Sequence, residues 1–219
     1  MELQDAIEKR QSIRKYKDGG VPKEHILEII RAASLAPSGK NIQNWHFVVI
    51  ANEDLKQKIG QAILDKNELI CIEMDKIDKE RGDAFRKFVR NFTLFFLKAP
   101  VLTVVFSTDY RPTGYYELEF VDSSPAVLTD LVKHRNPGMQ SLGAALENFT
   151  LKAIDLGYGS CLLTSANYAA AEIEELLKKE IGFDKEGYYM ASMIALGIPE
   201  DNQQSPRKKP VEQIMTYVD

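Results

Sequence analysis

The spacing of apolar residues predicts helices over much of the first half of the chain. Apolar side chains recur at helical intervals in residues 3–11, and a wide apolar stripe extends through 22–37, which has a proline at each end. Asn52 is a suitable cap for a helix running from residue 53 to about 64. Residues 65–98 also have a mostly helical pattern. The first half of the chain is therefore predicted to be helix-rich.

Short β-rich runs lie between these helical patterns. Four runs are predicted strands: 45–51, 101–108, 158–165 and 188–199. The run 101–108 is continuously apolar and β-branched, which is typical of a central strand. Two more helices are predicted over 139–157 and 168–182, each ending at a glycine. With no repeat or linker, the pattern predicts one α+β domain over residues 1–219.

The stretch 109–137 fits neither pattern well. It holds three prolines, several aromatic residues and little periodicity. A long segment of this kind is usually a functional lid or carries a short helix of its own. Tyr115, Tyr116 and Phe120 are candidate lid aromatics, and packing of the same side chains at the surface or in the core is the alternative. We therefore expect a variable lid segment over about 109–137.

Composition and charge narrow the functional classes. The 219 residues carry a net charge of −4, which argues against a general nucleic-acid binder. The longest apolar-rich stretch, 92–107, is interrupted by Lys98 and Pro100, and the N-terminus has no apolar signal core. The two cysteines and three histidines have no metal-ligand spacing, and GxGxxG is absent. We expect a soluble, cytoplasmic protein without a membrane or nucleic-acid partner and without a metal ion.

Two local basic clusters stand out in this acidic chain. Arg10, Ser12 and Arg14 alternate, so their side chains point the same way if the chain is extended after the first helix. Guanidinium groups bind phosphate through charge-assisted, bidentate hydrogen bonds. A second cluster lies at Arg207, Lys208 and Lys209. Each cluster taken alone is also compatible with solvated surface, but both suit a small anionic ligand.

Two polar loops could receive the rest of such a ligand. In "APSGKNIQN" (36–44) small and polar residues follow a helix and precede a strand, so backbone N–H groups and amides are available to a flat polar ring. In "GYGSCLLTS" (157–165) two glycines permit a close approach of the backbone. An ordinary helix–strand connection explains either loop equally well on spacing alone.

Five segments in order resemble one family. "RQSIRKY", "LAPSGKNIQNWHFVVI", "LENFTLKAIDLGYGSCLLT", "LGIP" and "RKKP" are similar to motifs of the nitroreductase family of FMN flavoproteins, and they cover nearly the whole chain. The resemblance implies an α+β fold with a central mixed β-sheet flanked by helices. It also implies a domain-intertwined homodimer with FMN at the subunit interface.

The same resemblance assigns cofactor-binding residues. Arg10, Ser12 and Arg207 would hold the 5′-phosphate with help from Lys209, and Gln11, which replaces a commoner arginine, would serve through its backbone. Arg14 would lie at the pyrimidine edge of the flavin. The remaining assigned residues are Pro37, Ser38, Gly39 and Asn41 from the other subunit, and Leu163, Thr164 and Ser165 beside the ring. No catalytic side chain is assigned.

Besides Gln11, two further departures from the commoner family wording are visible. Gln43-Asn44-Trp45 replaces Gln-Pro-Trp, and Thr164-Ser165 replaces a Glu-Gly pair found in some bacterial nitroreductases. The second departure separates this chain from that subgroup.

The family resemblance implies an FMN-dependent oxidoreductase. It would pass a hydride from NAD(P)H through flavin N5 to a small electron-poor acceptor (a nitroaromatic, quinone or flavin) by a ping-pong mechanism. The alternatives are a specialised member, either a reductive dehalogenase or a flavin-cleaving enzyme, and a non-catalytic flavin-binding or storage protein.

Overall fold

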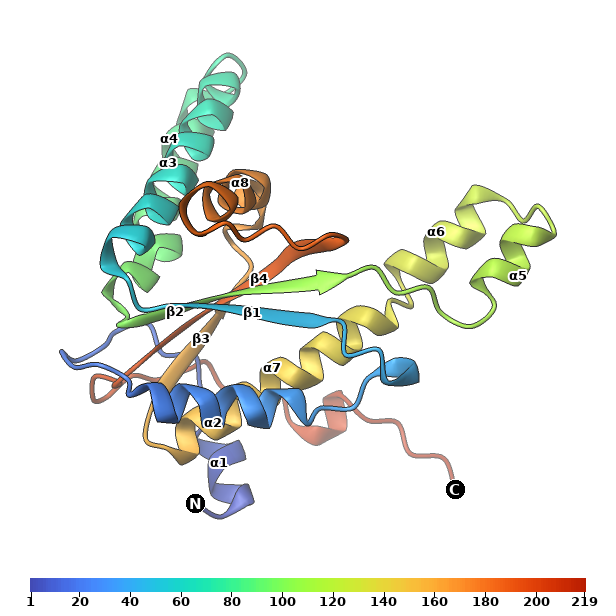
Figure 1. The fold of residues 1–219 in the computed structure, drawn as a ribbon, viewed down its shortest axis with the longest axis horizontal. Helices are drawn as coiled ribbons and strands as arrows, with labels where there is room; N and C mark the ends of the chain where they lie inside the picture. The colour runs from blue at the N-terminus through green and yellow to red at the C-terminus, as the bar shows by residue number, and fades with distance from the viewer.

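A four-stranded sheet forms the centre of the computed structural model, which describes residues 1–219. The strands are β1 (Trp45–Ile50), β2 (Val101–Thr108), β3 (Gly159–Leu163) and β4 (Tyr188–Gly197), in the spatial order β1-β2-β4-β3 (Figure 1). All three strand pairs are antiparallel. Each predicted run forms a strand, and β2 lies in the interior of the sheet as its apolar sequence predicts.

The parallel part of the predicted mixed sheet is reduced to a single bridge. Ser12 pairs in parallel with Ser160 on the edge strand β3, and Ile13 N donates to Ser160 O over 2.9 Å. The segment then leaves β3 and makes a second isolated bridge between Tyr16 and Pro199. Because it pairs with two partners at one point each, it adds isolated bridges rather than a fifth strand.

The chain forms eight α-helices. They are α1 (Leu3–Lys9), α2 (Lys23–Ser34), α3 (Glu53–Asp75), α4 (Lys79–Phe88), α5 (Tyr115–Phe120), α6 (Pro125–Lys133), α7 (Pro137–Asp155) and α8 (Ala170–Ile181). The expected cap of α3 is present, since Asn52 Oδ1 accepts from Leu55 N over 2.8 Å. The helix expected to end near residue 64 continues to Asp75, because no proline or other strong breaker interrupts it.

Helices cover both faces of the sheet. α2 and α7 lie on one face, and α3 and α8 lie on the other (Figure 1). The alternating side chains of β2 enter two separate cores: Leu102 packs in the core shared with α3 and α8, whereas Val101 and Val105 pack in the core shared with α2 and α7. Burial on both faces explains why this strand is apolar throughout.

A buried lysine anchors α3 to the sheet. The Lys56 side chain is only 2% exposed, and its ammonium group donates to Ala99 O and pairs with Glu53 Oε2 at 2.7 Å. Hydrogen bonding by Lys56 lowers the pKa of the Glu53 carboxyl. The ionised pair therefore stabilises the fold above the ordinary glutamate pKa.

This pair predicts a pH-dependent contribution to stability. Wild type should be more stable than Glu53→Gln at pH 7, because the variant leaves the Lys56 ammonium without its carboxylate. A carboxyl whose pKa is lowered on folding loses its stabilising effect as the pH falls, so the difference should shrink below about pH 4.3. Urea unfolding of both proteins at pH 7 and pH 3.5 measures it; a difference that stays constant between the two pH values contradicts the assignment.

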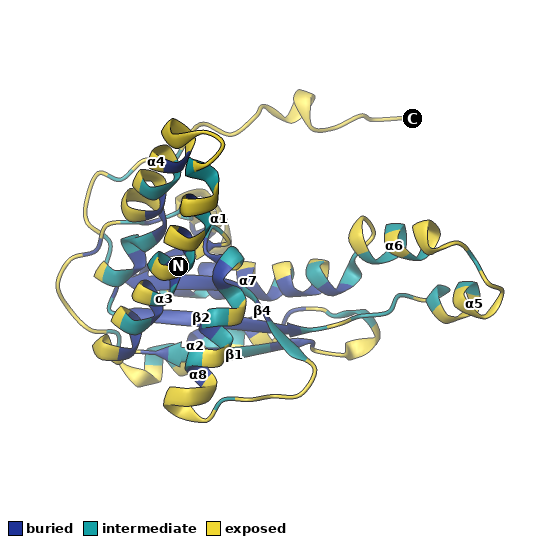
Figure 2. Ribbon diagram, turned by 90° about the horizontal axis from the view of Figure 1, so that it is seen from above, coloured by how far each residue is buried: buried dark blue, intermediate teal, exposed yellow.

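Residues 109–137, called the arm below, project away from the body (Figures 1 and 2). The arm consists of α5, α6 and their connections, and Phe120 at its outer end is 89% exposed. The prediction of a short helix in this stretch is confirmed, with two helices rather than one. The lid role of the arm stays a prediction.

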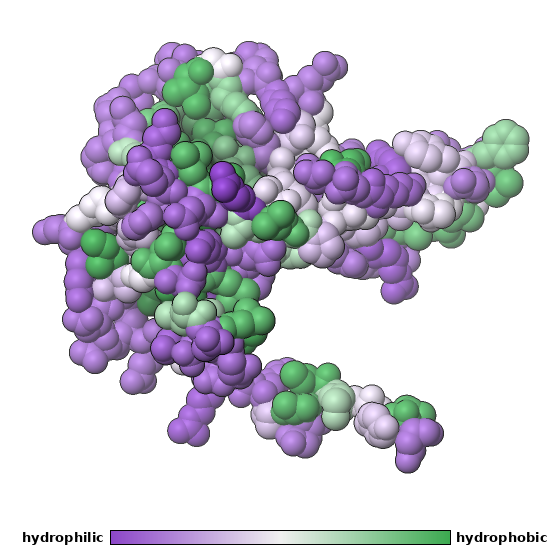
Figure 3. Space-filling view, turned by 60° about the horizontal axis from the view of Figure 1, so that its bottom comes forward, coloured by the Kyte–Doolittle hydropathy of each residue, from purple (hydrophilic) through white to green (hydrophobic).

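Residues 200–219, called the tail below, also leave the body as a largely irregular chain (Figure 2). Apolar side chains of the tail are exposed, and they form green patches in the space-filling view (Figure 3). These side chains are Val211, Ile214, Met215, Tyr217 and Val218. None of the helices combines the length and apolar character needed to cross a membrane.

Candidate functional site

The alternating Arg10–Arg14 segment is extended, as its predicted function requires. α1 ends at Lys9, and Arg10 adopts extended backbone angles (φ −62°, ψ 121°). The segment then lies against β3, where Gly159 permits the contact: a Cβ at Gly159 would stand 2.6 Å from Ile13 Cγ1. Only glycine allows the two backbones to lie this close, so the glycine-rich start of β3 positions the basic segment.

Arg10 of the first basic cluster lines one cavity together with part of the second cluster, whereas Ser12 and Arg14 do not line it. Arg10 and Gln11 line it from the start of the chain, and Arg207 and Lys208 line it from the tail. This space of about 600 Å³, called the anion cavity below, is lined by polar and charged residues and by Pro206. Glu147 Oε1 lies 3.4 Å from Arg10 Nε and orients that guanidinium at the wall. The positive charge from both ends of the chain therefore faces the same space.

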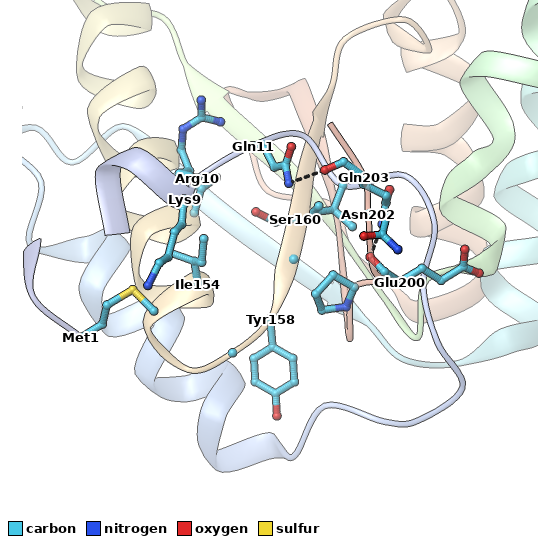
Figure 4. A pocket seen from close by; sticks show the side chains of 15 residues that line it. Met1, Lys9, Arg10, Gln11, Ile154, Tyr158, Ser160, Glu200, Asn202 and Gln203 are labelled. Atoms are coloured by element: carbon cyan, nitrogen blue, oxygen red, sulfur yellow. Dashed lines mark hydrogen bonds between the residues drawn. The ribbon is translucent and has the colours of Figure 1, made fainter. Parts of the chain in front are cut away.

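A glutamine that the sequence analysis did not single out holds the two clusters together. Gln203 Oε1 accepts from the backbone N–H groups of Arg14 and Lys15, both at 3.0 Å. Its Nε2 donates to Lys15 O at 2.8 Å, and Gln11 Nε2 donates to Gln203 O at 2.8 Å (Figure 4). Gln203 therefore fastens the tail to the basic segment. The tail sequence contains no motif that marks this residue.

Removing the Gln203 side chain should loosen the anion cavity. Gln203→Ala should lower the free energy of unfolding by about 1 kcal/mol, because most of its hydrogen bonds are to half-exposed or exposed backbone. The tail should also become cleavable by a protease at lower enzyme concentration than in wild type. Gln61→Ala, on the outer surface of α3, is the matched control. Equal tail cleavage in the two variants would show that Gln203 does not fasten the tail.

A second, smaller cavity adjoins the first. It has a volume of about 290 Å³ and shares Arg10, Gln11 and Gln203 with the anion cavity. Ser160 and Tyr158 line its other side, with Tyr158 pointing away from the basic residues (Figure 4). The polar space around the basic segment thus extends along the start of β3.

Arg14 has a separate environment. Its guanidinium carbon lies 5.1 Å from the ring centre of Phe92 and 5.8 Å from that of Phe95. Its Nε is buried and has no hydrogen-bond partner. A buried donor without a partner destabilises the protein by about 1–3 kcal/mol. A ligand that supplied an acceptor for Nε would remove this penalty. The π-helical turn Val89–Thr93 carries Phe92 to this position, a local irregularity often found at functional sites.

The neighbours of Arg14 do not neutralise its charge. Burial raises the pKa of the Cys161 thiol, and it also raises the pKa of Tyr16, whose hydroxyl donates to Ile13 O over 2.6 Å. Both groups are therefore protonated and neutral near pH 7. The environment of Arg14 remains positive and suits negative charge.

The end of β3 offers backbone rather than a large side chain. Leu163 is 2% exposed and its side chain packs in the core with α3 and α8, so only its backbone can touch a ligand. Thr164 is exposed and Ser165 is half-buried. The backbone oxygen of Thr164 accepts a hydrogen bond from Asn167 N over 3.1 Å, which fixes the turn after the strand.

Hydrogen bonds within the polar loop 37–43 and to α7 hold this loop in place. Ser38 Oγ accepts from Gln43 N over 3.0 Å, and Gly39 N donates to Ser141 Oγ over 3.3 Å. Lys40, Asn41 and Gln43 all have positive φ values, between 47° and 54°. Three left-handed non-glycine residues in so short a loop are uncommon and mark a strained conformation.

Not all the predicted site residues come together within one chain. The 37–43 loop sits beside Ser141 near the start of α7, whereas the cavities around Arg10 border Thr150 and Ile154 further along this helix. Nine residues of helix separate Ser141 from Thr150, a rise of about 14 Å. Lys209 is exposed and does not line the anion cavity, where Lys208 lies instead. Arg10, Gln11 and Arg207 are brought together; Pro37, Ser38, Gly39 and Asn41 lie elsewhere.

Helices on both faces of an antiparallel sheet, with a basic cavity at one edge, define an α+β fold with a candidate anion site. The Nitroreductase family model matches residues 7–198. This chain belongs to the nitroreductase family.

Particular relatives agree with this membership. A BluB-like flavoprotein from Clostridium difficile 630 is 60% identical to this chain over the full length of both chains, with a TM-score of 0.97. A nitroreductase with bound FMN from Desulfitobacterium hafniense DCB-2 has the same fold, with 23% identity over both full chains and a TM-score of 0.70. Iodotyrosine deiodinase 1 of Rattus norvegicus is 35% identical over 106 residues, which are 48% of this chain and 36% of that protein.

Proposed function

We propose that this protein binds FMN and acts as an FMN-dependent oxidoreductase. The observation that carries the proposal is the anion cavity, where Arg10 and Arg207 from opposite ends of the chain face one polar space. The Nε of Arg14 is buried without a hydrogen-bond partner, and it could donate to the polar edge of a ring bound near this segment. The similar flavoprotein from Clostridium difficile 630 supports a flavin as that ligand.

Each residue of the site has a role that follows from its chemistry. Arg10 and Arg207 would bind the 5′-phosphate by charge-assisted hydrogen bonds, Ser12 would add a hydroxyl donor, and Lys208 adds positive charge from the tail. Arg14 would donate from Nε to the ring edge and favour negative charge there. The backbone of residues 163–165 would border the ring, with Thr164 and Ser165 as polar neighbours.

The bound group would supply the redox chemistry. The chemistry that FMN would supply is hydride transfer from NAD(P)H to an electron-poor acceptor such as a nitroaromatic, a quinone or a flavin. The protein's own residues hold and orient the group, and no side chain of the site is required as an obligate acid or base. Because donor and acceptor would use one site in turn, we expect ping-pong kinetics.

We also propose that the functional unit is a homodimer. The 37–43 loop lies too far along α7 to meet the Arg10 cavity of its own chain, so a second copy would have to supply it. The tail and the arm expose apolar side chains, including Tyr217 and Phe120, that a partner would cover (Figure 3). Sedimentation of the FMN-loaded protein should give the mass of two chains; a flavin-loaded monomer would contradict this proposal.

A reductive dehalogenase is the second candidate. The similarity to iodotyrosine deiodinase supports it, and the arm provides a segment that could cover an aromatic substrate. In that reaction two electrons and one proton replace a C–I bond by C–H and release iodide.

One anaerobic experiment separates these candidates. The FMN-loaded protein is treated with NADH or NADPH, and the loss of flavin colour is followed. Rapid bleaching followed by recovery of colour with a nitroaromatic or quinone supports the main proposal. Recovery with iodotyrosine, accompanied by iodide release, favours the dehalogenase instead. Bound FMN that neither nucleotide bleaches favours flavin storage and contradicts NAD(P)H dependence.

A further inference from the structure

Asn44 connects three segments at the base of the arm. It is 1% exposed, and its Nδ2 donates to Ser107 Oγ at 2.8 Å and to Gly138 O at 3.1 Å. Its backbone oxygen accepts from Thr108 N at 3.1 Å. Ser107 and Thr108 end β2 just before the arm, and Gly138 lies in the first turn of α7 just after it. One buried side chain therefore holds both ends of the arm.

The 37–43 loop is packed against the same place. A Cβ at Gly39 would stand 2.7 Å from the Tyr110 hydroxyl, and a Cβ at Gly138 would stand 2.8 Å from Tyr110 Cβ. Tyr110 thus lies against both glycines. Gly39 N also donates to Ser141 Oγ, in the first turns of α7. The strained loop, the start of the arm and the end of the arm are in mutual contact around Asn44.

The side chain of Asn44 is better suited to holding segments together by hydrogen bonds than to filling space in the core. Its Oδ1 is buried without a partner, a cost that an apolar side chain or a proline would avoid. A proline, as in the commoner Gln-Pro-Trp sequence, has no side-chain donor and could hold neither Ser107 nor Gly138. The amide at this position therefore leaves one buried oxygen without a partner but makes two directed hydrogen bonds.

We propose that Asn44 is a positioning residue that joins the 37–43 loop to both ends of the arm, so that the three segments move as one unit. The part of this inference that concerns FMN rests on the proposed function, in which the loop contacts the cofactor. A ligand that orders the loop would then also order the arm. The coupling works through Asn44 rather than through any contact of the arm with the ligand.

Hydrogen exchange of the ligand-free protein tests the connection. In Asn44→Ala, exchange should be about tenfold faster at residues 38–43, 108–112 and 136–140 together, because two buried hydrogen bonds are lost. Amides of β4 should keep their wild-type rates. Asn148→Ala, which removes the hydrogen bond from Asn148 Nδ2 to Ala32 O between α7 and α2, is the matched control. Faster exchange in only one of the three segments, or equal changes in the control, would overturn the proposal.

A second comparison uses FMN and guards against misfolding. FMN should slow exchange in the arm of wild type, and this slowing should be lost in Asn44→Ala although FMN still binds. If FMN still slows exchange in the arm of that variant, the coupling through Asn44 is refuted. If FMN does not bind wild type, that result counts against the proposed function, and the ligand-free experiment alone tests the role of Asn44. If Asn44→Ala does not fold, Ser107→Ala removes one acceptor and should loosen residues 108–112 most; unchanged exchange there overturns the proposal.

Discussion

Replacing Arg207 or Arg10 by alanine is expected to weaken FMN binding by roughly 10- to 150-fold. Each substitution removes charge-assisted hydrogen bonds to the phosphate, which contribute about 1.5–3 kcal/mol. The two residues face the same cavity from opposite ends of the chain, so neither should compensate fully for the other. The affinity is measured by the change in flavin fluorescence when FMN is added to the apoprotein.

The matched control for these variants is Arg81→Ala. Arg81 is an exposed arginine on α4, away from the anion cavity. Its loss changes the net charge by the same amount, so it corrects for long-range electrostatics. Riboflavin, which lacks the phosphate, should bind wild type and the Arg10 and Arg207 variants equally well. Unchanged FMN affinity in both cavity variants would refute the phosphate assignment.

Gly159→Ala is expected to lower the free energy of unfolding and to weaken FMN binding. The new Cβ would meet Ile13 at 2.6–2.8 Å, where Ile13 is buried in the core and bonded to Ser160. Overpacking of this kind costs about 1–3 kcal/mol. Relief of the clash would move the basic segment off β3, so Arg10 and Arg14 would lose their positions.

Chemical unfolding and FMN titration of the Gly159 variant measure both effects. Gly20→Ala is the control, because no atom lies within 4 Å of its Cβ position and its backbone angle is ordinary. We expect that control to change the free energy of unfolding by no more than about 0.5 kcal/mol. A Gly159 variant as stable as the control would show that the basic segment is not tightly held against β3.

Local periodicity was sufficient to predict most of the architecture. The continuous apolar run of β2 indicated a strand buried on both faces, and the cores on its two sides confirm that. Helix ends were predicted where a specific residue enforces them, as at Gly157 and Gly182, both of which have positive φ. Where no such residue exists, as after residue 64, the length of α3 was underestimated.

Tertiary contacts explain what the sequence pattern could not predict. Gln203 acts through backbone groups of Arg14 and Lys15, and nothing in a polar tail distinguishes it from Gln204. Phe92 lies near Arg14 because of a π-helical turn, which an apolar spacing does not encode. The resemblance implied a mixed sheet, but all three strand pairs are antiparallel and only the bridge between Ser12 and Ser160 is parallel.

The placement of the candidate site residues was predicted in part, and their roles in binding stay predictions. The extended Arg10–Arg14 segment and its meeting with Arg207 were anticipated from the alternation of charges and the family resemblance. Lys208 rather than Lys209 lines the cavity, and the assignment of Lys209 to the phosphate stays a prediction. The 37–43 loop lies apart from the Arg10 cavity within one chain, so the role proposed for this loop requires a second copy.

The flavin content of the purified protein shows whether this chain binds FMN. We predict a yellow protein whose released cofactor is FMN rather than FAD, at one FMN for each chain, with the colour lost from the Arg10→Ala and Arg207→Ala double variant. A colourless protein that cannot be reconstituted with FMN would contradict the account.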